Sequence, residues 1–265
     1  MSDKMPSFVL SGIQQDGLVL PKKMRFEKER IIDCKLKDAN LSDPIFDQCI
    51  LESCSFEKSD FSGSRFFNKT LLAHCHFKTV DFQASGFSNS NSNSNSNSNS
   101  NSKFENCTFI RCNFREASLK DCEFSNCLFT QCKITDNSFN ASKINNLKFS
   151  GKLQEVSFIS EPPNTPLLVD FELCKLDWVT FQNCDLTQII PPADIQHVFF
   201  KDVSGRARKA LASITSEPDN QINKLLKRRL QKLTTQRGAL FNIKNLEEYE
   251  GPEFTKQFIA LLQAT

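Results

Sequence analysis

Apolar residues recur at every fifth position from Lys103 to Ser150 without a break. They are Phe104, Phe109, Phe114, Leu119, Phe124, Phe129, Ile134, Phe139, Ile144 and Phe149. A small residue, most often cysteine, lies two positions before most of them. This spacing matches neither the period of a helix nor that of a strand. The chain must therefore turn once per unit, which predicts a coil with these two positions pointing inward and the other three pointing to water.

The same pattern extends on both sides of this stretch. It runs from Cys34 to Phe87, with one extra residue before Leu72. We expect a bulge at residues 69–72 to absorb that residue. A last coil is predicted from the central residues Phe171, Leu176, Phe181 and Leu186. A pair of prolines then ends the repeat.

Three units carry a recognisable motif, namely Cys-Asn-Phe at 112–114, Ala-Ser-Leu at 117–119 and Ala-Asn-Leu at 39–41. They resemble the A(D/N)LXX consensus of the pentapeptide-repeat family or its Cys/Phe-rich variant. The resemblance covers residues 31–190, with breaks. It implies a mainly β fold, a right-handed four-sided parallel β-helix with four units per turn. Residues twenty apart should then stack, such as Phe104 on Phe124 and Phe109 on Phe129.

Three segments follow from where the pattern begins and ends. We expect residues 1–30 to form an N-terminal cap over the first open coil, and residues 31–190 to form the β-helix. Two loops should interrupt it, the Ser/Asn-rich stretch 88–102 and the proline-rich stretch 159–168. The alternative for 88–102 is an Asn/Ser coil that continues the solenoid with inward amides.

Residues 191–265 change to a helical period, which predicts a helical C-terminal cap or small domain. Its clearest apolar stripe is Ile222, Leu225, Leu226, Leu230 and Leu233. Residues 216–219 give a start signal for this helix, and Gly238 gives a stop signal. Further helices are expected at 206–214 and 252–262.

Charge is spread unevenly along the chain. Residues 31–190 carry 19 acidic and 15 basic side chains, a net charge of −4, whereas residues 191–265 carry 8 acidic and 12 basic ones. The pentapeptide-repeat family includes gyrase-interacting proteins whose β-helix imitates duplex DNA, so the resemblance offers gyrase protection as an alternative function. The size of the net charge counts against this function. Duplex DNA would carry about 20 negative charges over the length of the solenoid, roughly 34 Å, whereas residues 31–190 carry a net charge of −4.

Residues that could carry chemistry are sparse. An inward thiol in an apolar column has a raised pKa and no access to substrate. In the segment His74-Cys75-His76, Cys75 should point inward and both histidines outward, so the three cannot share one metal ion. No glycine-rich phosphate loop is present. We therefore expect no catalytic residues, no metal site and no cofactor, and thus no enzyme.

The N-terminal sequence lacks the basic flank and apolar run of a secretory signal. No stretch approaches the roughly 20 apolar residues of a membrane span. We therefore expect an intracellular, cytoplasmic chain.

Outward apolar and basic residues are the candidates for an interaction surface. Ile110 and Leu128 should lie on one side of adjacent coils, and Trp178 should also face outward. Docked termini that cover such residues are the alternative. The helix predicted around 222–233 adds a basic side, which includes Lys224, Lys227, Arg228, Arg229, Lys232 and Arg237. We interpret that side as a solvated face rather than a nucleic-acid or membrane site.

The sequence thus predicts a rigid, non-catalytic scaffold or assembly component that binds a protein partner. Self-association is an alternative form of that binding. Two other functions stay open: a DNA-mimicking topoisomerase protector, and an effector that acts on a host-cell partner.

The pair Ile110 and Leu128 allows a direct test. We expect the double variant Ile110→Asp, Leu128→Asp to lower the free energy of unfolding or to change the assembly state, because charges replace apolar contacts. Urea unfolding and size-exclusion chromatography measure these two effects. If neither changes, the pair forms neither a packing nor a partner surface.

Overall fold

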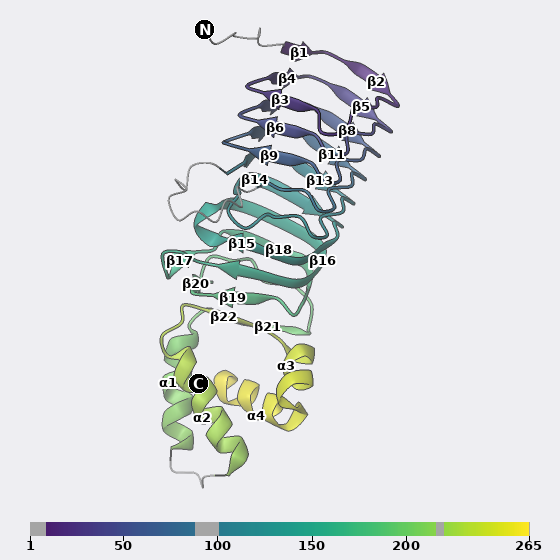
Figure 1. The fold of residues 1–265 in the computed structure, drawn as a ribbon. Coiled ribbons are helices and arrows are strands. Elements are labelled where there is room, and N and C mark those ends of the chain that lie inside the picture. Colours follow the sequence, from purple (N-terminus) through teal and green to yellow (C-terminus); the bar gives the residue numbers. More distant parts are fainter. Residues whose placement is uncertain (1–8, 88–100, 216–219, 265) are drawn as a thin grey trace.

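The computed structural model describes residues 9–87, 101–215 and 220–264. It consists of a four-sided solenoid of parallel strands, followed by a region of helices at its C-terminal end (Figure 1). The predicted fold class, a parallel β-helix with a C-terminal helical region, is confirmed.

Two sides of the solenoid are continuous ladders of short strands. The first side contains β1 (Val9–Ser11), β4 (Arg30–Ile32), β7 (Ile50–Glu52), β10 (Leu71–Ala73), β12 (Lys103–Glu105) and the start of β14 (Glu123–Thr130) and of β16 (Ile144–Ile159). The second side contains β2 (Gln14–Asp16), β5 (Lys35–Lys37), β8 (Ser55–Glu57), β11 (His76–Lys78), β13 (Thr108–Ile110), the later part of β14, the middle of β16, and the start of β18 (Val169–Asp177).

The other two sides are less regular. The third side is held by single bridges from Val19 up to Lys133, and then by β15 (Ile134–Asn140). The fourth side contains β3 (Arg25–Glu27), β6 (Ile45–Asp47), β9 (Arg65–Phe67), later parts of β15 and β16, and β19 (Thr180–Gln182). A short 3-10 turn, η1 (Ala141–Lys143), joins β15 to β16.

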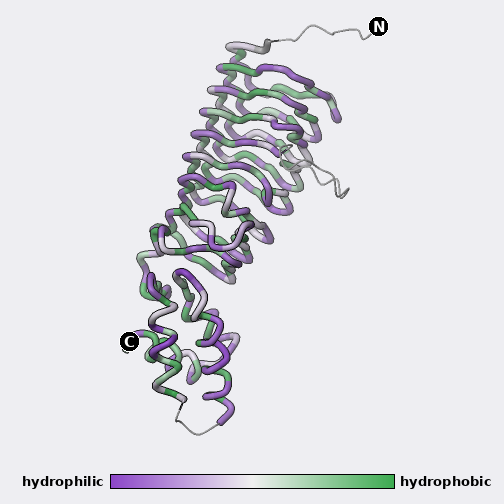
Figure 2. The backbone as a smooth tube through the Cα atoms, turned by 90° about the vertical axis from the view of Figure 1, so that its left-hand side faces the viewer, coloured by the Kyte–Doolittle hydropathy of each residue, from purple (hydrophilic) through white to green (hydrophobic). Residues whose placement is uncertain are grey.

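The core is a set of stacked aromatic columns. The rings of Phe104 and Phe124 lie 4.9 Å apart with an interplanar angle of 6°, and those of Phe109 and Phe129 lie 4.6 Å apart. These rings are buried. The predicted stacking at a spacing of twenty residues is therefore confirmed. Hydrophobic and hydrophilic stretches alternate along each coil, as Figure 2 shows.

A left-handed residue turns the chain at most corners, two positions after the central apolar residue. Asn126 and Gln131 both have a φ of 52°, and Trp178 has a φ of 53°. Such a conformation is uncommon for residues other than glycine and costs roughly 1–2 kcal/mol. The ladder above and below each corner must supply that free energy.

On the third side, asparagine and aspartate replace the strand with a side-chain turn. The Asp60 carboxylate accepts the amide of Ser62 at 2.8 Å, and the Asp81 carboxylate accepts that of Gln83 at 2.9 Å. Short Asx side chains form such turns readily. This bond is a physical reason for the Asp/Asn position of the repeat motif.

The N-terminal segment differs from the expected cap. Residues 9–27 build the first coil, because β1 pairs with β4, β2 with β5 and β3 with β6. The expectation of a cap over residues 1–30 is wrong for these strands, and residues 1–8 lie outside the described residues. The apolar pattern is interrupted in this segment, because Gln15 pairs with Leu36 at a position where an apolar residue is usual.

The Ser/Asn-rich stretch does not add a coil between β10 and β12. Leu72 pairs directly with Phe104, 32 positions later, whereas Phe104 pairs with Phe124, 20 positions later. Residues 88–100 of the predicted loop lie outside the described residues. Ser102 belongs to the solenoid rather than to a loop, because it is buried and its hydroxyl donates to the Phe66 carbonyl at 3.0 Å.

The extra residue before Leu72 is absorbed in a corner rather than in a ladder bulge. Asn68 and Lys69 are both left-handed, with φ values of 49° and 70°. Strand β10 then pairs with β7 without a register shift. The expected bulge at 69–72 is therefore corrected to a widened corner.

The proline-rich stretch holds the ladder, contrary to expectation. Strand β17 (Thr165–Pro166) pairs with β20 (Cys184–Asp185). The donors to the last coil are the amides of Ser160, Asn164 and Leu167, at 2.9, 2.7 and 2.9 Å. The prolines can be accommodated because the ladder takes its donors from the residues around them.

The C-terminal region contains the helices expected from its period. They are α1 (Val203–Ile214), α2 (Gln221–Leu233), α3 (Ile243–Glu250) and α4 (Pro252–Gln263), of which α3 was not expected. Helix α1 begins before Arg206 because Asp202 caps it. The cap of α2 is Asn220, which accepts the Asn223 amide at 2.8 Å, while the expected start signal at 216–219 lies outside the described residues.

An antiparallel ribbon joins the helices to the solenoid. It pairs β21 (His197–Phe200) with β22 (Ala239–Asn242). Phe199 and Leu240 pack on the solenoid core, whereas Phe200 and Phe241 pack on a separate core between the helices. The C-terminal region is thus both a cap and a domain with its own core. No helix in the described ranges is long and apolar enough to cross a membrane.

The stacked core allows a stability test. We expect Phe129→Ala to lower the free energy of unfolding by about 3–5 kcal/mol, because it leaves a cavity in the aromatic column. The neighbouring outward change Thr130→Ala should alter it by about 0.5 kcal/mol or less. Urea unfolding followed by circular dichroism measures both. Equal effects would contradict a core that depends on this column.

Candidate functional site

The small inward position is a hydrogen-bond donor. Thiols of Cys54, Cys107 and Cys127 donate to carbonyls of the preceding coil at 3.3, 3.2 and 3.4 Å. Ser85 and Asn137 make the equivalent bond at 2.8 and 3.0 Å. The cysteines are therefore core residues, as expected, with a bonding role that the sequence reasoning missed. The signal for it was the replacement of cysteine by other donors at the same position.

Burial also opposes ionisation of several inward thiols. It raises the pKa of Cys174 and of Cys184 to about 12, and raises that of Cys122. The nucleophile in cysteine chemistry is the thiolate, which such groups do not form near neutral pH. All eleven cysteines are free and buried.

The His74-Cys75-His76 segment diverges as predicted. Cys75 is buried in the core, whereas His74 is exposed at a left-handed corner and His76 is half-buried on the outer surface. No group of three His, Cys, Asp or Glu side chains within the described ranges is placed to hold a metal ion.

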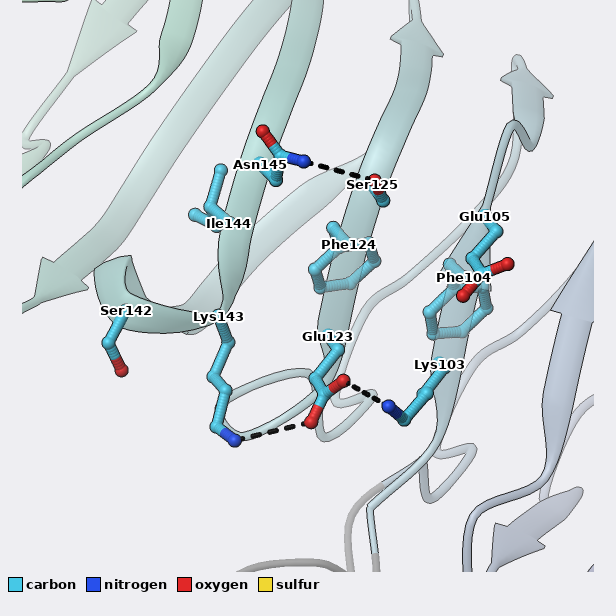
Figure 3. A pocket seen from close by; sticks show the side chains of 10 residues that line it. All are labelled: Lys103, Phe104, Glu105, Glu123, Phe124, Ser125, Ser142, Lys143, Ile144 and Asn145. Atoms are coloured by element: carbon cyan, nitrogen blue, oxygen red, sulfur yellow. Dashed lines mark hydrogen bonds and ion pairs between the residues drawn. The ribbon is translucent and has the colours of Figure 1, made fainter.

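Charges on the first side form a ladder across three coils. Lys103 and Lys143 lie 2.7 and 3.2 Å from the two carboxylate oxygens of Glu123 and point toward them (Figure 3). Burial opposes ionisation of Glu123, but the hydrogen bonds from both lysines outweigh it and lower the pKa of its carboxyl. The hollow beside this ladder, about 420 Å³, is also lined by Glu105, so the four charged side chains around it carry no net charge.

The predicted apolar pair lies on one side, as expected, but among polar neighbours. Ile110 and Leu128 are both half-buried on the second side. In the strand register, Ile110 lies between Lys78 and Thr130, and Leu128 lies next to Lys148. The two residues therefore do not form part of a continuous apolar patch.

The predicted basic side of α2 is an exposed stripe. Lys224, Arg228 and Lys232, spaced four residues apart, are exposed, and Lys227 is half-buried. On the other side of the helix, Leu226, Leu230 and Leu233 enter the helical core.

Trp178 faces outward at the junction between solenoid and helices. Its side chain is 39% exposed. Its amide donates to Asn245 Oδ1 at 3.0 Å, and Asn245 Nδ2 donates to Asp177 at 3.0 Å. The first turn of α3 is thus bonded to the corner that presents the tryptophan.

A second exposed aromatic residue lies one turn further along α3. Tyr249, 69% exposed, is four residues after Asn245 and therefore on the same side of the helix. The Arg229 guanidinium lies over its ring, 5.8 Å from the centroid, and pairs with Glu250. We call Trp178, Asn245, Tyr249 and Arg229 the junction surface. The sequence reasoning did not select Tyr249, although it is the only tyrosine in the chain.

A cleft of about 540 Å³ opens beside the junction surface, between the fourth side of the last coil and the cap. We call it the junction cleft. Its walls come from β19 and its flanks, from the end of α2 with the following loop, and from β22. Arg229 is the single charged residue among the fifteen that line it.

Family models match the repeats. The model for pentapeptide repeats (8 copies) matches residues 34–68, and that for a pentapeptide repeat region matches residues 102–161. The chain is a pentapeptide-repeat protein. No curated protein matches this pentapeptide-repeat chain.

Solved pentapeptide-repeat structures share little sequence with this chain. HetL of the cyanobacterium Nostoc, involved in heterocyst differentiation regulation, is 10% identical over 71% of this chain and 90% of its own, with a TM-score of 0.27. QnrB1, a plasmid-mediated fluoroquinolone resistance protein, is 13% identical over 66% and 94%, with a TM-score of 0.26. Rfr23 of Cyanothece is 9% identical over 66% and 89%, with a TM-score of 0.19.

The matches to the pentapeptide-repeat models end before the junction. Residues 34–68 and 102–161 include neither Trp178 nor any residue of the cap. The family therefore accounts for the solenoid and leaves the role of the junction surface open.

Thiol reactivity tests the structural role of the cysteines. We expect iodoacetamide at pH 8 to leave the thiols of the native pentapeptide-repeat protein unmodified over an hour, because all of them are buried and out of reach of the reagent. All eleven should react after unfolding in urea, as counted by intact-mass spectrometry. One thiol that reacts at the rate of free cysteine in the native protein would instead indicate a nucleophilic site.

Proposed function

We propose that this pentapeptide-repeat protein is a non-catalytic scaffold that binds a protein partner at the junction surface. The observation that carries the proposal is that exposed Trp178 is bonded through its amide to Asn245, and exposed Tyr249 lies one turn further along the same helix. Aromatic residues and arginine are enriched at the centres of protein interfaces. The surface combines two exposed aromatic side chains with the guanidinium of Arg229.

The junction surface rests on rigid elements. Below it, the ladder of the solenoid holds Trp178, and the side chain of Asn245 bonds both this corner and Asp177. Beside it, Lys152 pairs with Asp177 at 2.8 Å. A surface held in this way loses little conformational entropy when a partner binds.

The surface charges support the scaffold over the gyrase-binding alternative. Several acidic side chains on the solenoid are paired with bases from adjacent coils, as Glu123 is with Lys103 and Asp170 is with Lys148 at 2.7 and 2.6 Å. Such pairing cancels the negative field that a DNA mimic needs. No observation on the described residues favours the host-effector alternative.

The basic stripe of α2 adds no second function. Exposed Glu247 and Glu248 on α3 dilute its field within the same small domain. Nucleic-acid binding at Lys224, Arg228 and Lys232 is therefore not proposed, and the stripe is interpreted as a solvated face.

Affinity capture from native lysate tests the scaffold. We expect the double variant Trp178→Asn, Tyr249→Ser to retain at least tenfold less of the partner, measured by quantitative mass spectrometry, because the two aromatic anchors are lost. Asparagine is chosen for position 178 because it tolerates a left-handed backbone. The matched control is Met24→Asn, which removes an exposed apolar side chain at the opposite end of the solenoid.

Thermal unfolding should show that both variants stay folded. Equal capture by the wild-type chain, the control and the double variant would contradict the proposal. Sedimentation of the wild-type chain at increasing concentration distinguishes self-association, since a partner that is a second copy would raise the mass.

A further inference from the structure

Each coil of the solenoid leaves backbone donors for the coil above it. The amide of the central residue bonds upward, as Phe66 does to the Gly86 carbonyl at 2.7 Å. The amide of the corner residue also bonds upward, as Gln48 does to the Phe67 carbonyl at 3.2 Å. The last coil has no coil above it, so another partner must satisfy these groups.

The segment after the last coil and the cap satisfy these donors on three sides. The bonds join Phe171 to Ile190, Leu176 to His197, Trp178 to Asn245 and Leu186 to Arg237, at 2.8, 3.3, 3.0 and 2.6 Å. The buried His197 ring accepts from the Leu176 amide at Nε2, which leaves Nδ1 to donate to Asp194 at 2.7 Å. The cap therefore substitutes for much of the missing coil.

The fourth side is different. Strand β19 places the amides of Phe181 and Asn183 in the same upward positions, because Phe181 stands opposite Phe158. Within the part of the chain that the structure describes, no group accepts a hydrogen bond from either amide. By the same register, the carbonyls of Val179 and Phe181 also point upward. This edge is a template for one more parallel strand.

The unpaired edge lies in the junction cleft. Val179, Phe181 and Asn183 all line the cleft, and so does Phe241 of β22. An adjoining apolar hollow of about 160 Å³ shares Arg229 and Phe241 with it. The cleft thus offers backbone pairing together with an apolar pocket, a combination used for extended peptides.

Charge selects the peptide further. The cleft and the adjoining hollow are lined by Arg229 and Lys232, and no carboxylate lines either space. Arg229 also contacts Tyr249, so the cleft is continuous with the junction surface. Arg229 already bonds Glu250 through Nε and Nη2, so Nη1 is the group that it offers to the cleft. The exposed ammonium of Lys232 leaves a net positive charge beside it, which favours a carboxylate on a segment that reaches the cleft from a partner bound there.

We propose that the junction cleft binds an extended acidic peptide of the partner, added to β19 as a parallel strand with a side-chain carboxylate on Arg229. This inference rests on the proposed scaffold function and assigns the chemistry of the partner. The peptide amides would donate to the carbonyls of Val179 and Phe181, and its carbonyls would accept from the amides of Phe181 and Asn183.

A peptide selection tests the inference. Random dodecapeptides displayed on phage are selected on the intact chain and counter-selected on Thr235→Trp, which fills the cleft from an exposed position. We expect enriched clones to carry Asp or Glu and to bind the variant at least tenfold more weakly. A synthetic peptide of the leading clone should slow hydrogen exchange at the amides of Phe181 and Asn183.

Charge variants complete the test. Arg229→Gln should weaken the acidic peptide about tenfold, because a charged hydrogen bond is lost, and should not weaken the peptide in which Asp or Glu is changed to Asn or Gln. The matched control Lys224→Gln, on the exposed stripe of α2, should leave both affinities unchanged. The inference would be overturned if the selected peptides bind Thr235→Trp as tightly as the wild-type chain. It would also be overturned if they leave hydrogen exchange at the amides of Phe181 and Asn183 unaltered.

The partner captured by the wild-type chain separates this inference from the scaffold function. If capture of the partner depends on Trp178 and Tyr249 but persists in Thr235→Trp, the inference about the cleft is wrong and the proposed scaffold function is retained. Capture that is lost in Thr235→Trp, with the fold retained, supports the cleft.

Discussion

The hydrogen bonds between successive coils are the interaction on which the rest of this structure depends. Many backbone N–H and C=O groups of a coil have no hydrogen-bond partner within that coil and bond to the next coil instead. That requirement aligns the phenylalanine columns, holds the corners in a conformation that isolated residues avoid, and places Trp178 and Asn183 at defined positions. It also explains why a cap is needed after the last coil. The cap continues the bonding pattern with side chains and irregular backbone instead of another repeat.

Much of the solenoid could be predicted from the sequence because every fifth residue is an apolar side chain that lies in the core. Phe104, Phe124 and their neighbours specify the stacking, and the spacing alone requires a turn per unit. The first coil was missed where Gln15 replaces the expected apolar residue. The widened corner at Asn68 and Lys69 was missed because a side-chain pattern does not show which backbone angle absorbs an extra residue.

The candidate site was harder to predict, for a different physical reason. Trp178 was selected because it is an outward apolar residue within the repeat. Tyr249 and Arg229 lie on separate helices, and only tertiary packing brings the guanidinium over the ring. His197 and Asn245 bond residues of the last coil that lie 21 and 67 positions earlier in the sequence, and no periodic signal marks them. Contacts between a repeat and a non-repetitive domain leave no spacing to detect.

The pairing of β10 with β12 has a consequence for how such a chain can change. The strands are neighbours although Leu72 and Phe104 are separated by twelve more positions than Phe104 and Phe124 are. The aromatic rings on either side of this interruption, Phe87 and Phe104, still lie 5.3 Å apart. Lengthening a loop costs little free energy once its ends are held together, about 0.6 kcal/mol for each doubling. The corners of this solenoid are therefore places where new sequence can be acquired during evolution while the coils around it keep their register.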